Sequence, residues 1–413
     1  MDGLDDDRSE SGFRSRTPLS EARERFRAAV PDPDFDPVRL ELAAADGRVL
    51  AAARSAARNV PDYERVAMDG YAVRAEDTFD AGARSPAVLR EVEGTVEPGT
   101  ARRVDTGTEL PEGADAVVRI EYAEPFGGDV EITDRVTVGE NVAPVGEDVA
   151  RGDPLFEAGR RLGPSALGLL RSVGVERVPV APRPTVGVVP TGEELVRADA
   201  APGEIIETNG LTVSRFVERW GGRATHRNVV DDDPEALRVA IQRDLTKDVV
   251  VTTGGSSVGE RDLLPETIEG LGEVVVHGVG IKPGYPVALG VVEGTPVIAL
   301  PGYPVAAIVA ANAVLRPLLA WLQGTTVETH PARTARLERK IPSEPGIRTY
   351  ARVELAGSED EDGGSNERVA TPIRAGGAGV LSSAALADGW VVVSEASEGI
   401  PAGETVEVED WEP

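Results

Sequence analysis

The chain has 413 residues, and its 71 acidic against 43 basic residues give a formal net charge of −28 at pH 7. It contains no cysteine, which excludes disulfides, thiolate zinc sites and cysteine nucleophiles. Its histidines, His226, His277 and His330, match no metal-ligand spacing, and no basic stripe is present that would bind nucleic acid. The length predicts several domains.

The positive charge is carried almost entirely by arginine, because the only lysines are Lys247, Lys282 and Lys340. Excess carboxylate with little lysine is typical of a protein working in concentrated salt, where screening shortens the reach of self-repulsion to ~3 Å at 1 M. An acidic cytosolic protein of any other origin is the alternative. The acidic N-terminus and the lack of an uninterrupted apolar stretch of about 18 residues lead us to expect a soluble, cytoplasmic protein.

The first 181 residues change character three times. Residues 1–16 are polar and charged, which predicts a disordered tail. A helix is expected from Pro18 to about Val30 and another from Pro164 to Val173, so we assign residues 17–44 and 146–181 to a helical linking domain. Residues 45–145 hold short Val-rich segments between Gly, Pro and Asp, which predicts a β-rich insert domain.

Residues 182–329 alternate apolar strands with amphipathic helices. Strands are expected at 186–189, up to 230, and at 249–253, 273–277 and 297–300. Helices are expected at 211–220 with Asn209 as N-cap, from Pro234 with an Asp cap, and after Pro304. This alternation predicts a doubly wound, mostly parallel sheet covered on both faces. Residues 330–413 predict a small, β-barrel-like C-terminal domain with strands at 350–355, 390–393 and 405–408 and an acidic loop at 358–366.

The loops after the strands of the α/β domain carry the candidate chemistry, because ligands bind beyond the carboxyl ends of such strands. Residues 252–259 follow the most apolar strand, and Gly254 and Gly255 let the backbone approach a ligand closely. Successive N–H groups and the hydroxyls of Ser256 and Ser257 can then hold phosphate oxygens. A plain tight turn is the alternative.

Charged residues occupy the same loops. Glu194, Asp232 and Asp262 each follow an expected strand, and together they would suit a divalent cation that bridges phosphates. A helix cap or a solvated charge is the alternative for each of them. Lys282 lies in the stiff turn 281–286, where it could donate to a phosphate or could be an ordinary surface lysine. A second stiff turn, 300–305, precedes a helix whose N-terminus could face an anion.

Several motifs together carry a family resemblance. They are VAMDGYAVR at 66–74, TGTELPEGADAVV at 106–118, TGEEL at 191–195 and TTGGSSVG at 252–259. Over residues 18–413 the chain resembles the molybdopterin molybdenumtransferase family of the MoeA type, which is related to the E domain of gephyrin. Together with the composition, the resemblance indicates a halophilic archaeal origin.

The resemblance implies an elongated homodimer that converts adenylylated molybdopterin and molybdate into molybdenum cofactor and AMP, with Mg²⁺ or a similar divalent cation. A molybdopterin adenylyltransferase would supply the substrate. By position in the motifs, the implied catalytic residues are Asp69, Thr106, Glu194, Asp232 and Asp262. The last three would be metal ligands, and Asp69 and Thr106 would come from the partner subunit. The implied substrate-binding residues are Thr191, Gly192, Gly254, Gly255, Ser256, Ser257, Gly259, Lys282, Pro301 and Pro304.

The chain departs from the family pattern at several positions, so a paralogue with altered affinity stays open. Residues 141–145 lack the usual basic cluster, Tyr285 stands where a lysine is usual, and Tyr303 stands where asparagine is common. The preference for molybdate over tungstate is also open. Two other functions stay open: an adenylyltransferase or pyrophosphatase with the same α/β domain (the CinA-like proteins among them), and a non-catalytic scaffold. The motifs at 66–74 and 106–118 argue against the former, because those enzymes lack the β-rich insert.

Overall fold

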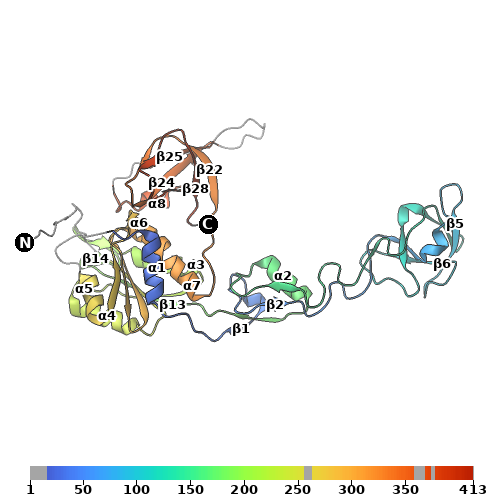
Figure 1. Cartoon of the computed structure of the whole chain (residues 1–413), viewed down its shortest axis with the longest axis horizontal. Helices are drawn as coiled ribbons and strands as arrows, with labels where there is room; N and C mark the ends of the chain where they lie inside the picture. Colours follow the sequence, from blue (N-terminus) through green and yellow to red (C-terminus); the bar gives the residue numbers. More distant parts are fainter. Residues whose placement is uncertain (1–15, 255–262, 358–367, 374–376, 413) are drawn as a thin grey trace, which may run out of the picture. The chain divides into compact units, whose positions relative to one another are not determined.

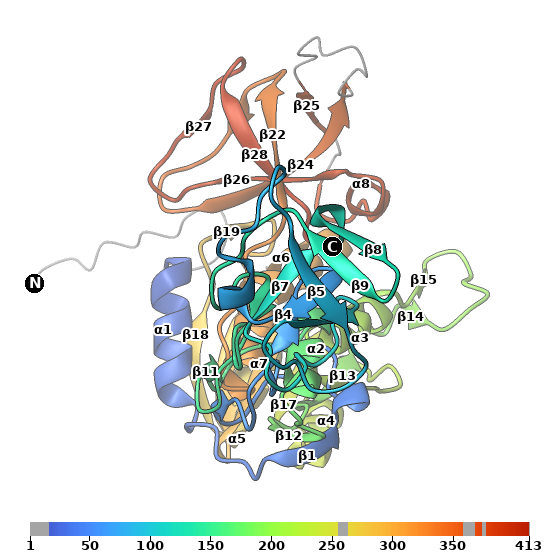
Figure 2. The same cartoon turned by 90° about the vertical axis from the view of Figure 1, so that its right-hand side faces the viewer.

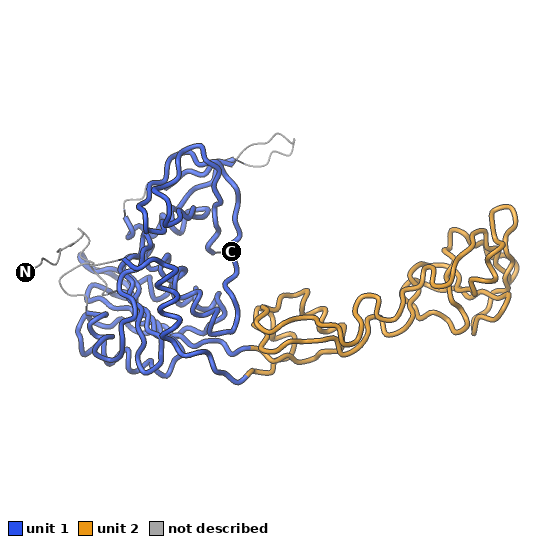
Figure 3. The backbone as a smooth tube through the Cα atoms, in the orientation of Figure 1, with its two compact units in different colours: residues 1–36, 181–413 blue, residues 37–180 orange. Residues whose placement is uncertain are grey.

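The computed structural model describes residues 16–254, 263–357, 368–373 and 377–412. The chain divides into two compact units, residues 37–180 and the remainder (Figures 1 and 3). The expected disordered tail, apart from Arg16, and the expected acidic loop at 358–366 lie outside the described residues. The five-part division made from the sequence is finer than this separation into two units, and its bounds stay predictions except for the helix at residues 19–29.

A six-stranded sheet forms the centre of the larger unit. Its strands, in spatial order, are β16 (Arg223–His226), β13 (Thr185–Pro190), β17 (Val249–Thr253), β21 (Thr295–Leu300), β20 (Ala288–Val292) and β18 (Glu273–His277). The first four strands are mutually parallel, while β20 is antiparallel to both of its neighbours. The mostly parallel sheet is therefore confirmed, although the sequence did not predict β20.

Helices cover both faces of this sheet, as the doubly wound pattern requires. Along the fully buried strand β17, Val249 and Val251 face one core and Val250 faces the other. On the first face lie α1 (Leu19–Ala29), α3 (Asn209–Arg219), α6 (Pro304–Ala310) and α7 (Arg316–Leu322). On the second face lie α4 (Pro234–Asp244) and α5 (Leu263–Leu271).

The place of α1 corrects the sequence-based domain assignment. We expected this helix to join residues 146–181 in a linking domain. Its apolar residues Leu19, Ala22 and Phe26 instead pack into the core beside β18 and β20 of the α/β sheet. The spacing of these residues predicts a helix with one apolar face, but it does not say which distant surface that face covers.

Residues 304–322 form one helical segment in which α6 and α7 are joined by a π-helical stretch at Ala311–Leu315. By length and composition this segment is apolar enough to cross a membrane, but 78% of its most apolar 18-residue stretch is buried inside the protein. Such burial is typical of a core helix in a globular domain.

The C-terminal domain is a closed barrel, which confirms the barrel-like prediction (Figure 2). Around the ring its strands are β24 (Arg348–Ala356), β25 (Val369–Pro372), β22 (Ala332–Leu337), β28 (Thr405–Glu409) and β26 (Gly389–Val393). Pairing of β26 with β24 closes the ring. The short strand β19 (Ile281–Lys282) leaves the α/β domain and pairs in parallel with β24.

The smaller unit is rich in β-structure, as predicted. Its largest sheet has the spatial order β7 (Ala116–Arg119), β4 (Gly70–Val73), β6 (Thr100–Val104), β5 (Ala87–Glu91), β9 (Asp129–Ile132) and β8 (Ala123–Phe126). The expected second helix is α2 (Pro164–Ser172), which packs near the ladder of β1 (Val38–Glu41) and β12 (Arg177–Val180). Gly70 begins β4 beside β7, where a Cβ would lie 1.9 Å from the Val118 carbonyl oxygen.

Candidate functional site

Three loops meet where parallel strands of the α/β sheet end. The Thr191 amide donates to the Thr253 carbonyl at 3.0 Å, and the Gly254 amide donates to the Leu300 carbonyl at 3.2 Å. The Gly192 amide donates to the Val230 carbonyl at 3.1 Å. These bonds hold the ends of β13, β17 and β21 side by side, which is the edge at which the sequence predicts a ligand.

Gly254 allows close approach between these loops. Its φ is +123°, and a Cβ there would lie 2.0 Å from the Thr191 carbonyl oxygen. Gly192, with φ +146°, faces the carboxylate of Glu194, and a Cβ there would lie 2.9 Å from Oε2. Gly254 is therefore required by a backbone contact within the protein, whereas Gly192 is favoured by its positive φ.

Three threonines place buried hydroxyls at this edge without hydrogen-bond partners. Thr191, Thr252 and Thr253 are each 1% exposed, and the structure gives none of their Oγ1 atoms a hydrogen bond. A buried polar group without a partner costs about 1–3 kcal/mol, so each of these hydroxyls indicates a nearby ligand or water. Successive residues of a strand face opposite sides of the sheet, so the hydroxyls of Thr252 and Thr253 do not point to one spot. Sequence reasoning did not assign Thr252 and Thr253 to the site, although two threonines ending a run of buried valines are a usable signal.

Asp232 is a half-buried carboxylate at this edge. Its Oδ1 is buried without a hydrogen bond. The pKa of Asp232 is raised, first by burial and then by the negative charges of Glu194, Glu193 and Asp231. The structure thus brings Asp232 and Glu194 together, as predicted from the sequence. We name Thr191, Glu194, Asp232, Thr252 and Thr253 the strand-end cluster.

Gly255, Ser256, Ser257, Gly259 and Asp262 all lie outside the described residues. Within the described ranges, no group of three or more His, Cys, Asp or Glu side chains is arranged to hold a metal ion. The Oδ1 atom of Asp232 is nevertheless suited to a bound cation, because it is buried without a hydrogen bond and repelled by neighbouring carboxylates. Asp232 and Glu194 therefore fit as two of the three predicted metal ligands.

Asp233 caps a helix as expected, whereas Asn209 does not. Asp233 caps α4 by accepting from the amides of Glu235 at 3.0 Å and Ala236 at 2.9 Å, which leaves Asp232 without a capping role. Asn209 is not the N-cap of α3 but its first residue, and its Nδ2 donates to the Gly302 carbonyl at 2.6 Å. That bond ties α3 to the turn before α6.

The turn before α6 is partly covered by the C-terminal domain. Pro301 is buried, Pro304 is half-buried at the start of α6, and Tyr303 is 67% exposed. The Val305 amide, in the first turn of α6, donates to the Ala378 carbonyl at 3.0 Å. One amide that could have faced an anion is therefore already bonded within the chain.

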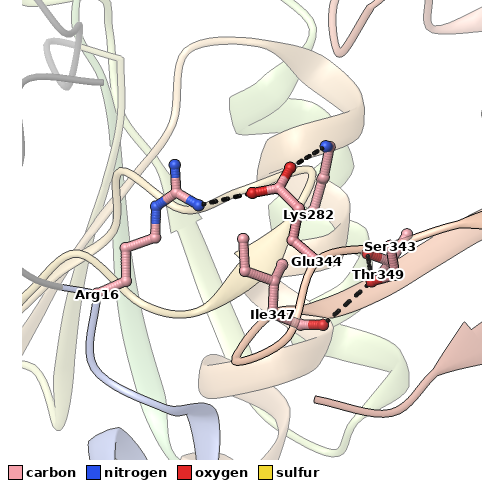
Figure 4. Close-up of polar contacts among 6 residues, drawn as sticks. All are labelled: Arg16, Lys282, Ser343, Glu344, Ile347 and Thr349. Atoms are coloured by element: carbon pink, nitrogen blue, oxygen red, sulfur yellow. Dashed lines mark hydrogen bonds and ion pairs between the residues drawn. The ribbon is translucent and has the colours of Figure 1, made fainter. Parts of the chain in front are cut away.

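Lys282 lies at the expected edge of the sheet, but its ammonium group has a protein partner. Strand β20 starts at Ala288 opposite Ala299, so the preceding turn reaches the edge where β21 ends. A Cβ on Gly284 in this turn would lie 3.1 Å from the Ala306 carbonyl oxygen of α6. The Nζ atom of Lys282 donates to Oε1 of Glu344 at 2.9 Å (Figure 4).

In the smaller unit the structure joins the two other predicted residues. Oδ1 of Asp69 accepts from the Thr106 amide at 2.7 Å and from its hydroxyl at 2.8 Å. These two bonds, followed by the positive charge of Arg103, lower the pKa of Asp69. Both residues are exposed, so a fixed, ionised carboxylate faces solvent at the start of β4.

Three regions of the chain match regions of MoeA proteins and of molybdopterin-binding domains. Residues 17–174 match the MoeA N-terminal region (domain I and II), and residues 334–411 match the MoeA C-terminal region (domain IV). Residues 187–321 match the probable molybdopterin-binding domain, so the α/β domain is of that type. The chain belongs to the MoeA family of molybdopterin molybdenumtransferases.

Individual relatives cover almost the whole chain. A putative molybdopterin biosynthesis protein of Methanocaldococcus jannaschii is 34% identical over 381 residues, 89% of this chain and 91% of the relative. The molybdopterin molybdenumtransferase of Bacillus subtilis is 30% identical and covers 87% of this chain and 86% of its own length. The crystal structure of a molybdopterin biosynthesis moeA protein from Pyrococcus horikosii superposes with a TM-score of 0.80 at 33% identity, covering 96% of this chain and 99% of that one.

Proposed function

We infer that the chain is a molybdopterin molybdenumtransferase that acts in molybdenum cofactor biosynthesis. Curated relatives from Bacillus subtilis, Haemophilus influenzae and Mycobacterium tuberculosis have this name, and all three MoeA regions are present. The observation that carries the proposal is the strand-end cluster, in which buried hydroxyls and one buried carboxylate oxygen have no partner within the protein. Such groups are retained where a polar ligand completes their bonding.

The proposed reaction takes adenylylated molybdopterin and molybdate and yields molybdenum cofactor and AMP. The two thiols of the pterin lose their protons as their sulfurs bind molybdenum, and one molybdate oxygen leaves with those protons as water. Hydrolysis of the pyrophosphate bond releases AMP and leaves the other phosphate on the pterin. In this scheme the hydroxyl of Thr191, which lies beside Gly254, donates to a ligand oxygen. We assign the phosphates to the predicted Gly-rich loop, which begins at Gly254, where the backbones approach closely.

We propose that Glu194 and Asp232, with Asp262, hold Mg²⁺ or a similar divalent cation. The bound cation would supply positive charge to the pyrophosphate group. The fit rests on the raised pKa of Asp232, because an oxygen that is repelled by Glu194, Glu193 and Asp231 is stabilised by a nearby cation. Carboxylates without a cation would repel both molybdate and phosphate.

We also propose a homodimer in which Asp69 and Thr106 of the partner subunit complete the site. Two hydrogen bonds from Thr106 fix the carboxylate of Asp69, yet both residues are exposed. A fixed but uncovered carboxylate suits a surface that meets another chain or a ligand. The family resemblance supports the dimer.

The setting that we propose is the cytoplasm of a halophilic archaeon, with a molybdopterin adenylyltransferase as the supplier of substrate. The support is compositional, since 71 acidic residues accompany only three lysines. Activity should therefore persist in concentrated salt, where exposed charges are screened.

AMP release from adenylylated molybdopterin on addition of molybdate tests this function. We expect release that depends on molybdate and on a divalent cation, and its loss in an Asp262→Ala variant. A parallel reaction with tungstate measures the preference between the two oxyanions. Unchanged release in Asp262→Ala would contradict the assignment of that residue. An adenylyltransferase would instead consume a nucleoside triphosphate without molybdate, and a scaffold would catalyse neither reaction.

A further inference from the structure

Glu344 of the C-terminal domain contacts two cations of the α/β unit (Figure 4). Its Oε1 accepts from Nζ of Lys282 at 2.9 Å, and its Oε2 lies 3.5 Å from a guanidinium nitrogen of Arg16. The Arg16 guanidinium also lies over the ring of Tyr285, 5.3 Å from its centroid. The pKa of Glu344 is lowered, chiefly by its bond to Lys282, so the carboxylate is ionised where it meets the lysine.

Backbone pairing fixes both sides of this contact. Ile281 and Lys282 pair in parallel with Arg348 and Thr349 of β24, and the Arg348 amide donates to the Gly280 carbonyl at 2.8 Å. Glu344 lies in the turn before β24. That turn is held because the Ser343 and Thr349 hydroxyls are 2.7 Å apart and hydrogen bonded. The barrel therefore positions both the lysine and the carboxylate that neutralises it.

The ion pair itself is readily broken. The side chains of Lys282 and Glu344 are 54% and 55% exposed, and exposed pairs of this kind contribute little to folding stability. A diphosphate group carries more negative charge than one carboxylate, so it would compete effectively for the same ammonium group. Lys282 is also one of only three lysines in the chain, and Glu344 accepts a hydrogen bond from it.

We propose that Glu344 is a specificity-determining residue that occupies Lys282 in the free protein and is displaced by the diphosphate group of an incoming ligand. The inference rests on the proposed function only in assigning a diphosphate to this edge of the sheet. Glu344 acts through Lys282 and does not touch the reacting atoms. It keeps the lysine side chain in place and discriminates against anions too weakly charged to displace a carboxylate.

Calorimetric binding of inorganic pyrophosphate to the full chain tests the proposal. Glu344→Gln should bind pyrophosphate more tightly, by up to about fivefold, because an exposed ion pair no longer has to be broken. The gain should shrink as salt is raised, because screening weakens the competing pair. Thermal unfolding of each variant establishes that it is folded, and Glu344→Asp, which keeps the charge on a shorter arm, should give a smaller gain.

Glu412→Gln is the matched control. Glu412 forms a comparably exposed ion pair with Arg219, at 3.8 Å, between the C-terminal domain and the last turn of α3. That helix end lies near the start of β16. Arg223 there pairs with Thr185, the first residue of β13, so this control pair lies at the amino-terminal ends of the parallel strands, away from the strand-end cluster. Removing the same charge there should leave pyrophosphate affinity unchanged.

The double variant Lys282→Met/Glu344→Gln separates local competition from a general charge effect. In the Lys282→Met background, Glu344→Gln should no longer alter pyrophosphate affinity. Equal gains with and without the lysine, or unchanged or weaker binding by Glu344→Gln alone, would overturn the proposal. Binding is measured without turnover, so a chain that shows these affinities but releases no AMP refutes the proposed function and leaves this inference standing.

Discussion

Asp232 and Asp69 are two candidate catalytic carboxylates that the protein holds in opposite ways. Asp232 lies in the α/β unit with a buried oxygen that accepts no hydrogen bond, and neighbouring carboxylates raise its pKa. Asp69 lies in the smaller unit, fully exposed, and two bonds from Thr106 lower its pKa. The same chemical group is therefore destabilised as an anion in one region and stabilised in the other.

This difference indicates different functions for the two residues. A carboxylate that the protein leaves unsatisfied gains most from a ligand that brings positive charge. A carboxylate that the protein has already ionised and fixed is ready to position or polarise a group brought to it. We therefore expect loss of the Asp232 carboxylate to abolish cation-dependent AMP release. Loss of the Thr106 hydroxyl, which bonds to Asp69, should only lower the rate.

The largest effect is expected from Asp232→Asn. Removing a cation ligand should lower the rate of AMP release on the order of 100-fold or more. The same change should raise the melting temperature, because it removes repulsion by Glu194, Glu193 and Asp231. Rate assays and thermal unfolding in the absence of divalent cations measure the two effects. A variant that is both active and less stable would contradict our view of this carboxylate.

Asp233→Ala is the neighbouring control for that variant. Asp233 caps α4, so its loss should cost about 0.5–2 kcal/mol of stability and leave the rate of AMP release nearly unchanged. The pH dependence of stability separates the two carboxylates further. Since the folded-state pKa of Asp232 is raised, its contribution falls as pH rises from the ordinary aspartate pKa through the raised value. Asp232→Asn should lack that decrease.

A smaller effect, on stability, is expected from adding a methyl group where backbones meet. Gly254→Ala and Gly70→Ala place a Cβ about 2 Å from a carbonyl oxygen, in the larger and the smaller unit respectively. Each should destabilise its unit by roughly 1–3 kcal/mol, measured by denaturant unfolding. Gly94→Ala, where nothing lies within 4 Å of the new Cβ, should be neutral. Equal stability of all three variants would show that the close approaches are not tight.

The mildest change is expected from Thr106→Val, which removes one of the two donors to Asp69. Loss of one hydrogen bond to a charged group should lower the rate of AMP release by roughly tenfold. Because bonding to Thr106 lowers the pKa of Asp69, the acid limb of the rate profile should move to higher pH in this variant. Thr106→Ser keeps the hydroxyl and should keep the profile. An unshifted acid limb in Thr106→Val would separate Asp69 from the chemistry.

Local patterns predicted much of the fold. The Val-rich strands β13, β17 and β21 and the capped helix α4 are all where the sequence predicts them, because burial period and turn residues are short-range signals. Strand β20 was missed because its five residues show no clean alternation. The packing of α1 onto the α/β sheet was also missed, since Leu19, Ala22 and Phe26 pack beside strands that begin at residues 273 and 288.

The candidate site was predicted only in part, because contacts between residues far apart in the chain leave no local pattern. Loop position alone placed Glu194 and Asp232 together, and the motifs brought Asp69 to Thr106. Two threonines at the end of a buried valine run are visible in the sequence, but the lack of partners for their hydroxyls is not, because that depends on every surrounding element. The bond from Lys282 to Glu344 joins residues 62 positions apart, and no local pattern pairs them.

Mixing two inactive variants tests most directly whether the two carboxylates form one site across a dimer. Asp69→Asn and Asp232→Asn proteins are dissociated, combined and allowed to re-form, and AMP release from adenylylated molybdopterin with molybdate is measured. A twofold dimer with shared sites predicts recovery of roughly a quarter of the wild-type rate, because half of the re-formed dimers are mixed and each has one intact site. A mixture that exchanges subunits but stays as inactive as either parent would contradict the shared site.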